Sequence, residues 1–127
     1  AEVSVDGNRK VTVHQVTVAA DVGPIVNMSG AENQCQGAVI DGLSTTLGRG
    51  LAIENGRVQE SNFDQYPLLR IGSAPKVDVH FIQSEYAPTG LGEPALPPIA
   101  PAVCNAIFAA SGYRVRELPL AKEGFSV

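Results

Sequence analysis

One carboxylate of the sequence lies in a segment stiff enough to aim it. Glu93 belongs to the run Gly90-Leu-Gly-Glu-Pro-Ala-Leu-Pro-Pro98, directly ahead of an apolar stretch that begins at Ile99. Pro94 restricts Glu93 to extended backbone, and Gly92 allows the backbone to approach a ligand closely. A general base must lie within hydrogen-bonding distance of the proton that it accepts, so a rigid turn suits this role. The residue types therefore favour Glu93 as a proton acceptor, and the alternative is a solvated turn acid that interacts with a helix N-terminus.

The first elements that must position this turn are strands. Val3 and Val5 alternate with polar residues up to Asp6-Gly7-Asn8, after which the alternation resumes from Val11. This pattern predicts a β-hairpin. The pair His14-Gln15 breaks the alternation and indicates a bulge or a change of face before the strand ends near residue 21.

Two segments have the spacing of helices. In residues 31–47, small and apolar residues recur at helical intervals, which predicts a helix packed on a sheet. Gly37 and Gly42 should let this helix approach its neighbours closely. A second apolar stripe runs from Ile99 to Ala110, and Gly112 is placed to end that helix as its C-terminal cap.

The remaining segments complete a fold class. Asn55-Gly56 predicts a second hairpin, between short strands at 51–54 and 57–59, because both turn residues need positive φ. Residues 77–81 alternate like a half-buried strand, residues 61–75 have no clear period, and the tail 113–127 is expected to be peripheral. This order predicts an α+β fold, a mainly antiparallel sheet with two helices packed on one face. The length of 127 residues suits one domain, residues 1–127.

The composition and the residue spacing argue against several classes of function. A net charge of −4 and a pI near 5.0 provide no basic stripe, so we expect no nucleic-acid partner. His14 and His80 have no second ligand at metal-binding spacing, and we predict no metal ion held by protein side chains. Cys35 and Cys104 are interpreted as small buried hydrophobes, and Asp41 as a residue of a polar helix face.

Several blocks of the sequence resemble one enzyme family. In order, they are Val18–Gly23 with Asn27, Gln34–Leu43, Gly90–Pro98, Asn105–Phe108 and Arg114–Leu120. Together they are similar to the C-terminal part of the molybdenum-binding subunit of xanthine oxidase-type hydroxylases, in the branch of isoquinoline 1-oxidoreductase β-subunits and membrane-bound aldehyde dehydrogenases. The chain also begins at Ala1, without methionine and already in a strand pattern. We therefore expect a C-terminal fragment of the molybdenum-cofactor-binding domain of a larger subunit.

The resemblance implies a reaction and residues for it. In this family, a molybdenum held by a molybdopterin, often in the cytosine dinucleotide form, hydroxylates an N-heteroaromatic ring or an aldehyde with oxygen from water. The glutamate of the Gly-Glu-Pro motif is the general base, and Glu93 matches it. Gln34 matches the glutamine that contacts the pterin, and the backbone of Gly92 is expected to approach the cofactor. The isolated fragment is expected to be inactive because the other cofactor-binding segments are missing.

The resemblance also implies partners and a location. The partners are the remainder of the large subunit, a small subunit whose iron–sulfur clusters receive the electrons, a cytochrome c subunit and a small-molecule substrate. The location is periplasmic or membrane-associated, with the cytoplasm as the alternative. A function of another class is a non-catalytic structural or interaction domain, in which Glu93 is only a turn residue. Glycine-rich cofactor loops upstream of Ala1 would favour the enzyme.

Overall fold

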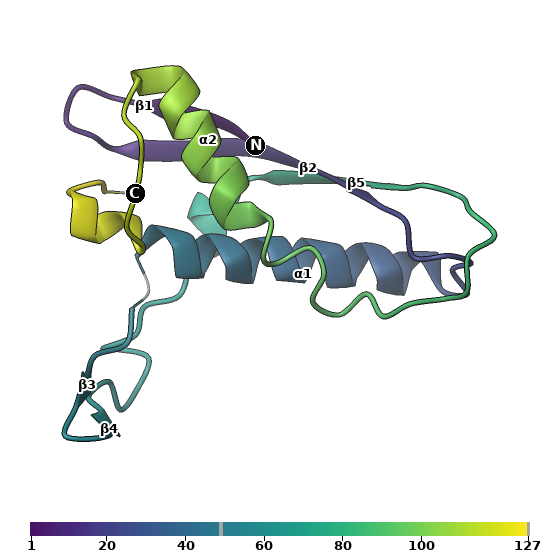
Figure 1. Ribbon diagram of the computed structural model, residues 1–127, viewed down its shortest axis with the longest axis horizontal. Helices are drawn as coiled ribbons and strands as arrows, with labels where there is room; N and C mark the ends of the chain where they lie inside the picture. Colours follow the sequence, from purple (N-terminus) through teal and green to yellow (C-terminus); the bar gives the residue numbers. More distant parts are fainter. Residues whose placement is uncertain (49, 127) are drawn as a thin grey trace.

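A three-stranded sheet with two helices on one face forms the body of the molecule, as Figure 1 shows. The computed structural model describes residues 1–48 and 50–126. The sheet has the order β1-β2-β5, and strands β3 and β4 form a separate hairpin. The bounds of the strands are β1 Glu2–Val5, β2 Val11–Ala20, β3 Ile53–Glu54, β4 Arg57–Val58 and β5 Lys76–Phe81. The helices are α1 Met28–Leu47 and α2 Ile99–Ser111, with short 3₁₀ turns η1 Ile71–Ser73 and η2 Leu120–Glu123.

The β1–β2 hairpin contains the expected bulge. Glu2 lies opposite Gln15 and Val3 lies opposite Val13, so His14 is the extra residue and has no counterpart in the register of β1. The extra residue changes which positions face the helices. Residues Val11 and Val13 before the bulge and Val16 after it are all buried on the same side.

The sheet confirms the predicted fold class and adds one detail of topology. The β1–β2 and β3–β4 pairs are antiparallel, whereas β2 and β5 are parallel over Gln15–Ala20 and Lys76–Phe81. A parallel pair needs a crossover connection, and here the connection contains α1. This crossover brings the middle of α1 beneath β5 and the segment that follows it (Figure 1).

Helix α1 begins earlier than the periodicity predicts because Asn27 caps it. The Asn27 side-chain oxygen accepts a hydrogen bond from the Gly30 N–H at 3.0 Å, which satisfies one of the free donors of the first turn. The helix ends at Leu47, as predicted. Its inner stripe includes the fully buried residues Cys35, Val39 and Leu43.

Helix α2 has the predicted limits. It ends at Gly112, which has a φ of 75° and donates its N–H to the Phe108 carbonyl, as expected of a glycine cap. Val103 and Ile107 face α1 and the sheet and are fully buried. Among the described residues, neither helix combines the length and the apolar character that a bilayer crossing requires.

The β3–β4 hairpin projects away from the body (Figure 1). Its turn has positive φ at Asn55 (51°) and Gly56 (75°), as the sequence predicts. The hairpin and the segment that follows it, residues 51–66, are called the arm below (Figure 1). Large apolar residues of this arm are exposed, among them Ile53, Val58 and Phe63. The arm therefore contributes little to the core of the described chain.

The expectation that the tail 113–127 is peripheral is wrong for its described part, residues 113–126, and residue 127 lies outside the described residues. Val115, Leu120 and Phe125 are buried in the core, and the Ser126 carbonyl accepts the Val11 N–H at 2.8 Å. The Arg9 guanidinium lies 5.7 Å from the centre of the Phe125 ring. The tail has no helical or strand period because its contacts come from a 3₁₀ turn and from ring packing, neither of which leaves a repeat in the sequence.

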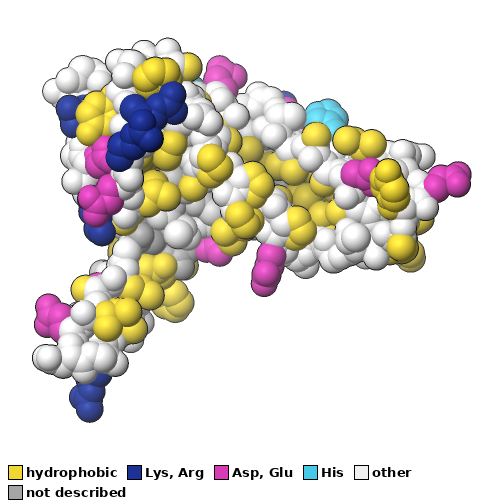
Figure 2. All heavy atoms as spheres, viewed as in Figure 1, with side chains coloured by type: hydrophobic (Ala, Val, Ile, Leu, Met, Phe, Trp, Pro, Cys, Tyr) yellow, Lys and Arg dark blue, Asp and Glu magenta, His cyan; other side chains and the backbone are white. Residues whose placement is uncertain are grey.

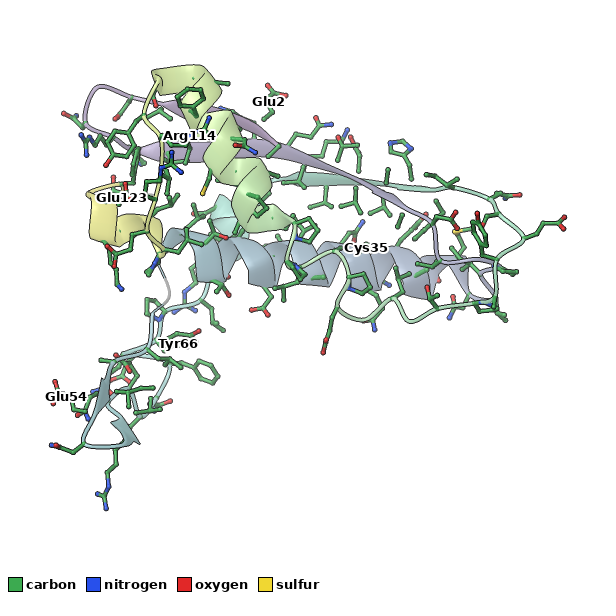
Figure 3. The ribbon with its side chains drawn as sticks, viewed as in Figure 1. Glu2, Cys35, Glu54, Tyr66, Arg114 and Glu123 are labelled. Atoms are coloured by element: carbon green, nitrogen blue, oxygen red, sulfur yellow. The ribbon has the colours of Figure 1, made fainter. Side chains whose placement is uncertain are left out.

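The tail is also held by Glu123, and this contact is expected to depend on pH. A hydrogen bond from Tyr113, with further ones from the Arg116 and Glu117 N–H groups, lowers the pKa of the Glu123 carboxyl below its ordinary value of 4.5. A depressed pKa in the folded state adds stability above the unfolded pKa, and this stability is lost as the pH falls through the folded pKa. We expect the melting temperature of the wild type to exceed that of Glu123→Gln at pH 7. The difference should shrink below about pH 4. A difference in melting temperature that stays constant with pH would contradict this role. Glu123 is labelled in Figure 3.

Candidate functional site

The structure brings the three predicted site residues to one pocket. This pocket, called the shared pocket below, has a volume of about 370 Å³ and lies between α1 and the turn that precedes α2. Gln34 comes from α1, and Gly92 and Glu93 come from the turn. The full lining is Gln34, Gly37, Ala38, Asp41, Gly92, Glu93, Leu96 and Pro97.

One face of α1 forms the first wall of the shared pocket. Gln34, Ala38 and Asp41 line it because residues three, four and seven positions apart lie on the same side of a helix. Within residues 1–48 and 50–126, no protein group is hydrogen-bonded to the Gln34 amide. An exposed amide with both a donor and an acceptor is therefore available to a polar ligand.

The turn forms the second wall, and its position is fixed from two sides. Ala95 is buried in a small apolar cluster with Cys35 and Ala38 of α1; Figure 3 labels Cys35 on this helix. The Glu93 carbonyl accepts the Leu96 N–H at 2.9 Å, which closes the turn. The Glu93 side chain itself remains exposed beside the pocket. The backbone around this carboxylate is thus braced, while its oxygens can reach a bound molecule.

Gly92 lies next to the Gln34 amide. A Cβ placed on Gly92 would be 3.6 Å from the Gln34 Nε2 atom, an ordinary contact distance. Two residues far apart in the sequence therefore present a backbone segment and an amide side by side. This pairing can hold a planar polar group through hydrogen bonds on one edge.

The width of the site depends on Gly42. A Cβ at this position would lie 2.9 Å from the Leu96 carbonyl oxygen and 3.0 Å from the Ile99 Cβ atom. Helix α1 and the beginning of α2 thus approach more closely than a side chain at 42 would allow, as the sequence predicts. The same expectation for Gly37 is wrong, because a Cβ there would meet nothing within 4 Å. Gly37 opens onto the shared pocket instead.

A larger pocket adjoins the shared pocket. It has a volume of about 600 Å³ and shares Leu96 and Pro97 with it as lining residues. No local pattern in the sequence predicts this second pocket, because its walls come from α1, the base of the arm and the tail. Asp41, which the pattern predicts only as a residue of a polar helix face, also lines the shared pocket. Its seven-residue spacing from Gln34 is the signal that places both residues on one wall.

The donor set of the shared pocket suits an organic cofactor and not a bare metal ion. The polar groups are one amide, carboxylates and the backbone near Gly92. In the described part of the chain, no three histidine, cysteine, aspartate or glutamate side chains are grouped so that they could hold a metal. Burial raises the pKa of the Cys35 and Cys104 thiols, which disfavours the thiolate that binds metals. An amide beside an open backbone matches the edge of a nitrogen heterocycle such as a pterin.

Comparison with known sequences gives a consistent result. A family model for the molybdopterin cofactor-binding domain matches residues 1–75. The chain is 40% identical over 121 residues to membrane-bound aldehyde dehydrogenase (pyrroloquinoline-quinone) of Gluconacetobacter polyoxogenes, covering 94% of this chain and 16% of that protein. It is 34% identical over 109 residues to isoquinoline 1-oxidoreductase subunit beta of Brevundimonas diminuta, covering 86% and 14%. The chain thus spans about one sixth of the length of these relatives.

Solved structures share the fold. Quinoline 2-oxidoreductase from Pseudomonas putida 86 superposes with a TM-score of 0.77 at 17% identity, over 90% of this chain and 16% of that one. The Cu,Mo-containing CO dehydrogenase superposes with a TM-score of 0.71 at 18% identity, over 80% and 14%. At these identities the superpositions establish the architecture of the chain.

Proposed function

Since this chain belongs to the family of the molybdopterin cofactor-binding domain, we propose that it forms one wall of the active site of a molybdenum hydroxylase. The single observation that carries this proposal is the shared pocket. Gln34, Gly92 and Glu93 are brought to it from two distant segments by the α1 crossover and the braced turn. The resemblance assigns cofactor contact and proton transfer to these same three residues.

The chain is proposed to be one domain, residues 1–127, at the C-terminal end of a larger molybdopterin-binding subunit. The relatives support a larger subunit, because the chain spans only 16% and 14% of their lengths. A pocket of about 370 Å³ with one amide, two carboxylates and the backbone at Gly92 can hold only part of a dinucleotide cofactor. The rest of the subunit would supply the other walls, so the isolated chain is expected to be inactive.

Each residue then has a defined task. The Gln34 amide and the backbone at Gly92 hold the edge of the pterin, and the Glu93 carboxylate accepts the proton that water loses as its oxygen is transferred to the substrate. When bound, the molybdenum cofactor supplies the redox chemistry and takes up two electrons. Glu93 needs no side-chain ion pair for this task, because the hydrogen-bonded turn fixes its backbone and leaves its oxygens exposed.

The proposed substrates are aldehydes or N-heteroaromatic rings. The relatives support both, since one is named an aldehyde dehydrogenase and another an isoquinoline oxidoreductase. We further propose the cytosine dinucleotide form of the cofactor, an iron–sulfur subunit and a cytochrome c subunit as electron acceptors, and a periplasmic or membrane-associated location, with a cytoplasmic one as the alternative. The name of the first relative supports membrane association.

The test is to purify the intact subunit complex and measure both its cofactor and its activity. Molybdenum and pterin in near-stoichiometric amounts, with oxidation of aldehydes or quinoline-type heterocycles, are the expected results. A complex that contains pyrroloquinoline quinone and no molybdenum would overturn the proposal. Molybdenum without turnover on either substrate class would retain the cofactor role and overturn the substrate assignment.

Gln34→Ala in the intact subunit is expected to weaken cofactor retention. One hydrogen bond between neutral groups contributes about 0.5–1.5 kcal/mol, which corresponds to roughly a 3- to 10-fold change in affinity. The change would be measured as the molybdenum content that remains in each purified variant after dialysis. Gln36→Ala is the matched control, because Gln36 is exposed on the same helix and does not line the shared pocket. Equal retention in the two variants would remove Gln34 from the site.

A further inference from the structure

Strand β2 is longer than the strand that covers its outer edge. It runs from Val11 to Ala20, and β1 pairs with it only as far as Gln15. On the other edge, β5 continues the pairing up to Ala20. Figure 1 shows the N-terminus about halfway along β2, with the rest of that edge uncovered.

The alternation along β2 determines which main-chain N–H and C=O groups face the uncovered edge. The Ala20 carbonyl accepts the Ile82 N–H at 2.9 Å, on the β5 side. Because successive residues of a strand direct their N–H and C=O groups to opposite edges, Thr17 and Ala19 direct theirs to the uncovered edge. No strand among the described residues pairs with this edge beyond Gln15. Free groups of this kind are a template for another strand.

An apolar pocket of about 340 Å³ lies along the same edge. Its lining includes residues 16–20 of β2, Asp21 and Val22 after that strand, and Leu91, Pro94 and Pro98 of the segment before α2. Ala1, one residue before β1, also lines this pocket. Figure 2 shows apolar side chains in the hollow beside α2, in the region between the sheet and the turn.

We propose that this edge and pocket are the docking site of one further strand, which continues β1 beyond Ala1 and runs antiparallel to β2. The register follows from the Glu2–Gln15 pair, which sets Ala1 opposite Val16. The four preceding positions then lie opposite Thr17 to Ala20. Those opposite Val18 and Ala20 point into the pocket and should be apolar, and the other two face solvent.

The occupant is a segment of the larger subunit and not a second copy of this chain. Continuity with the β1–β2 pairing requires a strand in line with Ala1, and the relatives contain several times more polypeptide than this chain. The inference rests on the part of the proposed function that places the chain in a larger subunit. It does not depend on the role of Glu93, so its failure would leave the cofactor content and the Glu93 test unchanged.

The test uses two extensions of equal composition before Ala1. Val-Thr-Val-Thr places both valines toward the pocket, whereas Thr-Val-Thr-Val turns them to solvent. We expect amide hydrogen exchange at Thr17 and Ala19 to slow at least about 10-fold with the first extension and to remain unchanged with the second. Thr17→Pro, which removes a donor from the open edge and leaves the β5 side intact, should abolish the protection at Ala19.

Equal exchange with both extensions would overturn the proposal. Protection that rises with protein concentration, together with a dimer in size-exclusion chromatography, would overturn it in favour of a second copy. In the intact subunit, the peptide over residues 16–20 should exchange as slowly as the β1-paired peptide over 11–14. Faster exchange there would show that no strand docks, whether or not the isolated chain folds.

Discussion

Replacing Glu93 by glutamine in the intact subunit is expected to lower kcat by about 10²- to 10⁴-fold, the usual contribution of a positioned general base. Glutamine has the same size and can occupy the same turn, but its amide cannot accept the proton. The turn itself should be unaffected, because its closing hydrogen bond joins the Glu93 carbonyl to the Leu96 N–H and leaves the side chain out. Burial of Ala95 against α1 also does not involve the carboxylate.

The measurement must separate proton transfer from cofactor binding. Molybdenum and pterin content should stay at the wild-type level in Glu93→Gln while turnover falls, and KM should change far less than kcat. Glu85→Gln is the matched control, since Glu85 is an exposed loop carboxylate outside the shared pocket. Near-normal turnover in Glu93→Gln would leave Glu93 as a turn residue and would favour the structural alternative for this domain.

Gly42→Ala is expected to destabilise the fold, although alanine is the better helix former. The helix propensity of alanine would contribute about 1 kcal/mol in favour of the variant. Against this, the new methyl group would meet the Leu96 carbonyl oxygen at 2.9 Å and Ile99 at 3.0 Å, and such overpacking costs about 1–3 kcal/mol. Because the nearest atom belongs to the backbone, it cannot rotate away. The start of α2 and the turn that carries Glu93 would have to move away from α1.

Gly37→Ala is the matched control on the same helix. Its methyl group meets nothing within 4 Å, so the free energy of unfolding should rise by up to about 1 kcal/mol. Urea unfolding of the 127-residue chain would measure both variants. Equal stabilisation by the two alanines would contradict the close approach at Gly42. In the intact subunit, Gly42→Ala should also reduce cofactor content, because the wall that carries Gly92 would shift.

Local signals predicted the elements of this fold well. Asn55-Gly56 and Gly112 adopt the positive φ values that their neighbours in sequence require, and the broken alternation at His14 becomes a bulge. The features that the sequence does not predict are long-range contacts. The parallel pairing of β2 with β5 and the packing of Phe125 into the core join segments more than fifty residues apart, and no local period encodes such contacts.

The candidate site likewise combines residues that the sequence predicts with a long-range arrangement that it does not predict. A single acid before proline is a weak signal, and it was the resemblance that linked Glu93 with Gln34. The structure places them at one pocket through Ala95, whose burial against Cys35 and Ala38 no sequence period indicates. The sequence predicts close packing at Gly37, but glycine permits both close approach and open space, and only the surroundings of the residue distinguish the two. The roles of the three residues stay predictions that the variants above can decide.

The bulge at His14 also affects how this strand should be compared with others. Before it, odd-numbered positions such as Val11 and Val13 face the helices; after it, even-numbered positions such as Val16 do so. The two halves of β2 are therefore out of phase by one residue. An alignment or a designed library that treats the strand as one uninterrupted alternation would assign every side chain of one half to the wrong side.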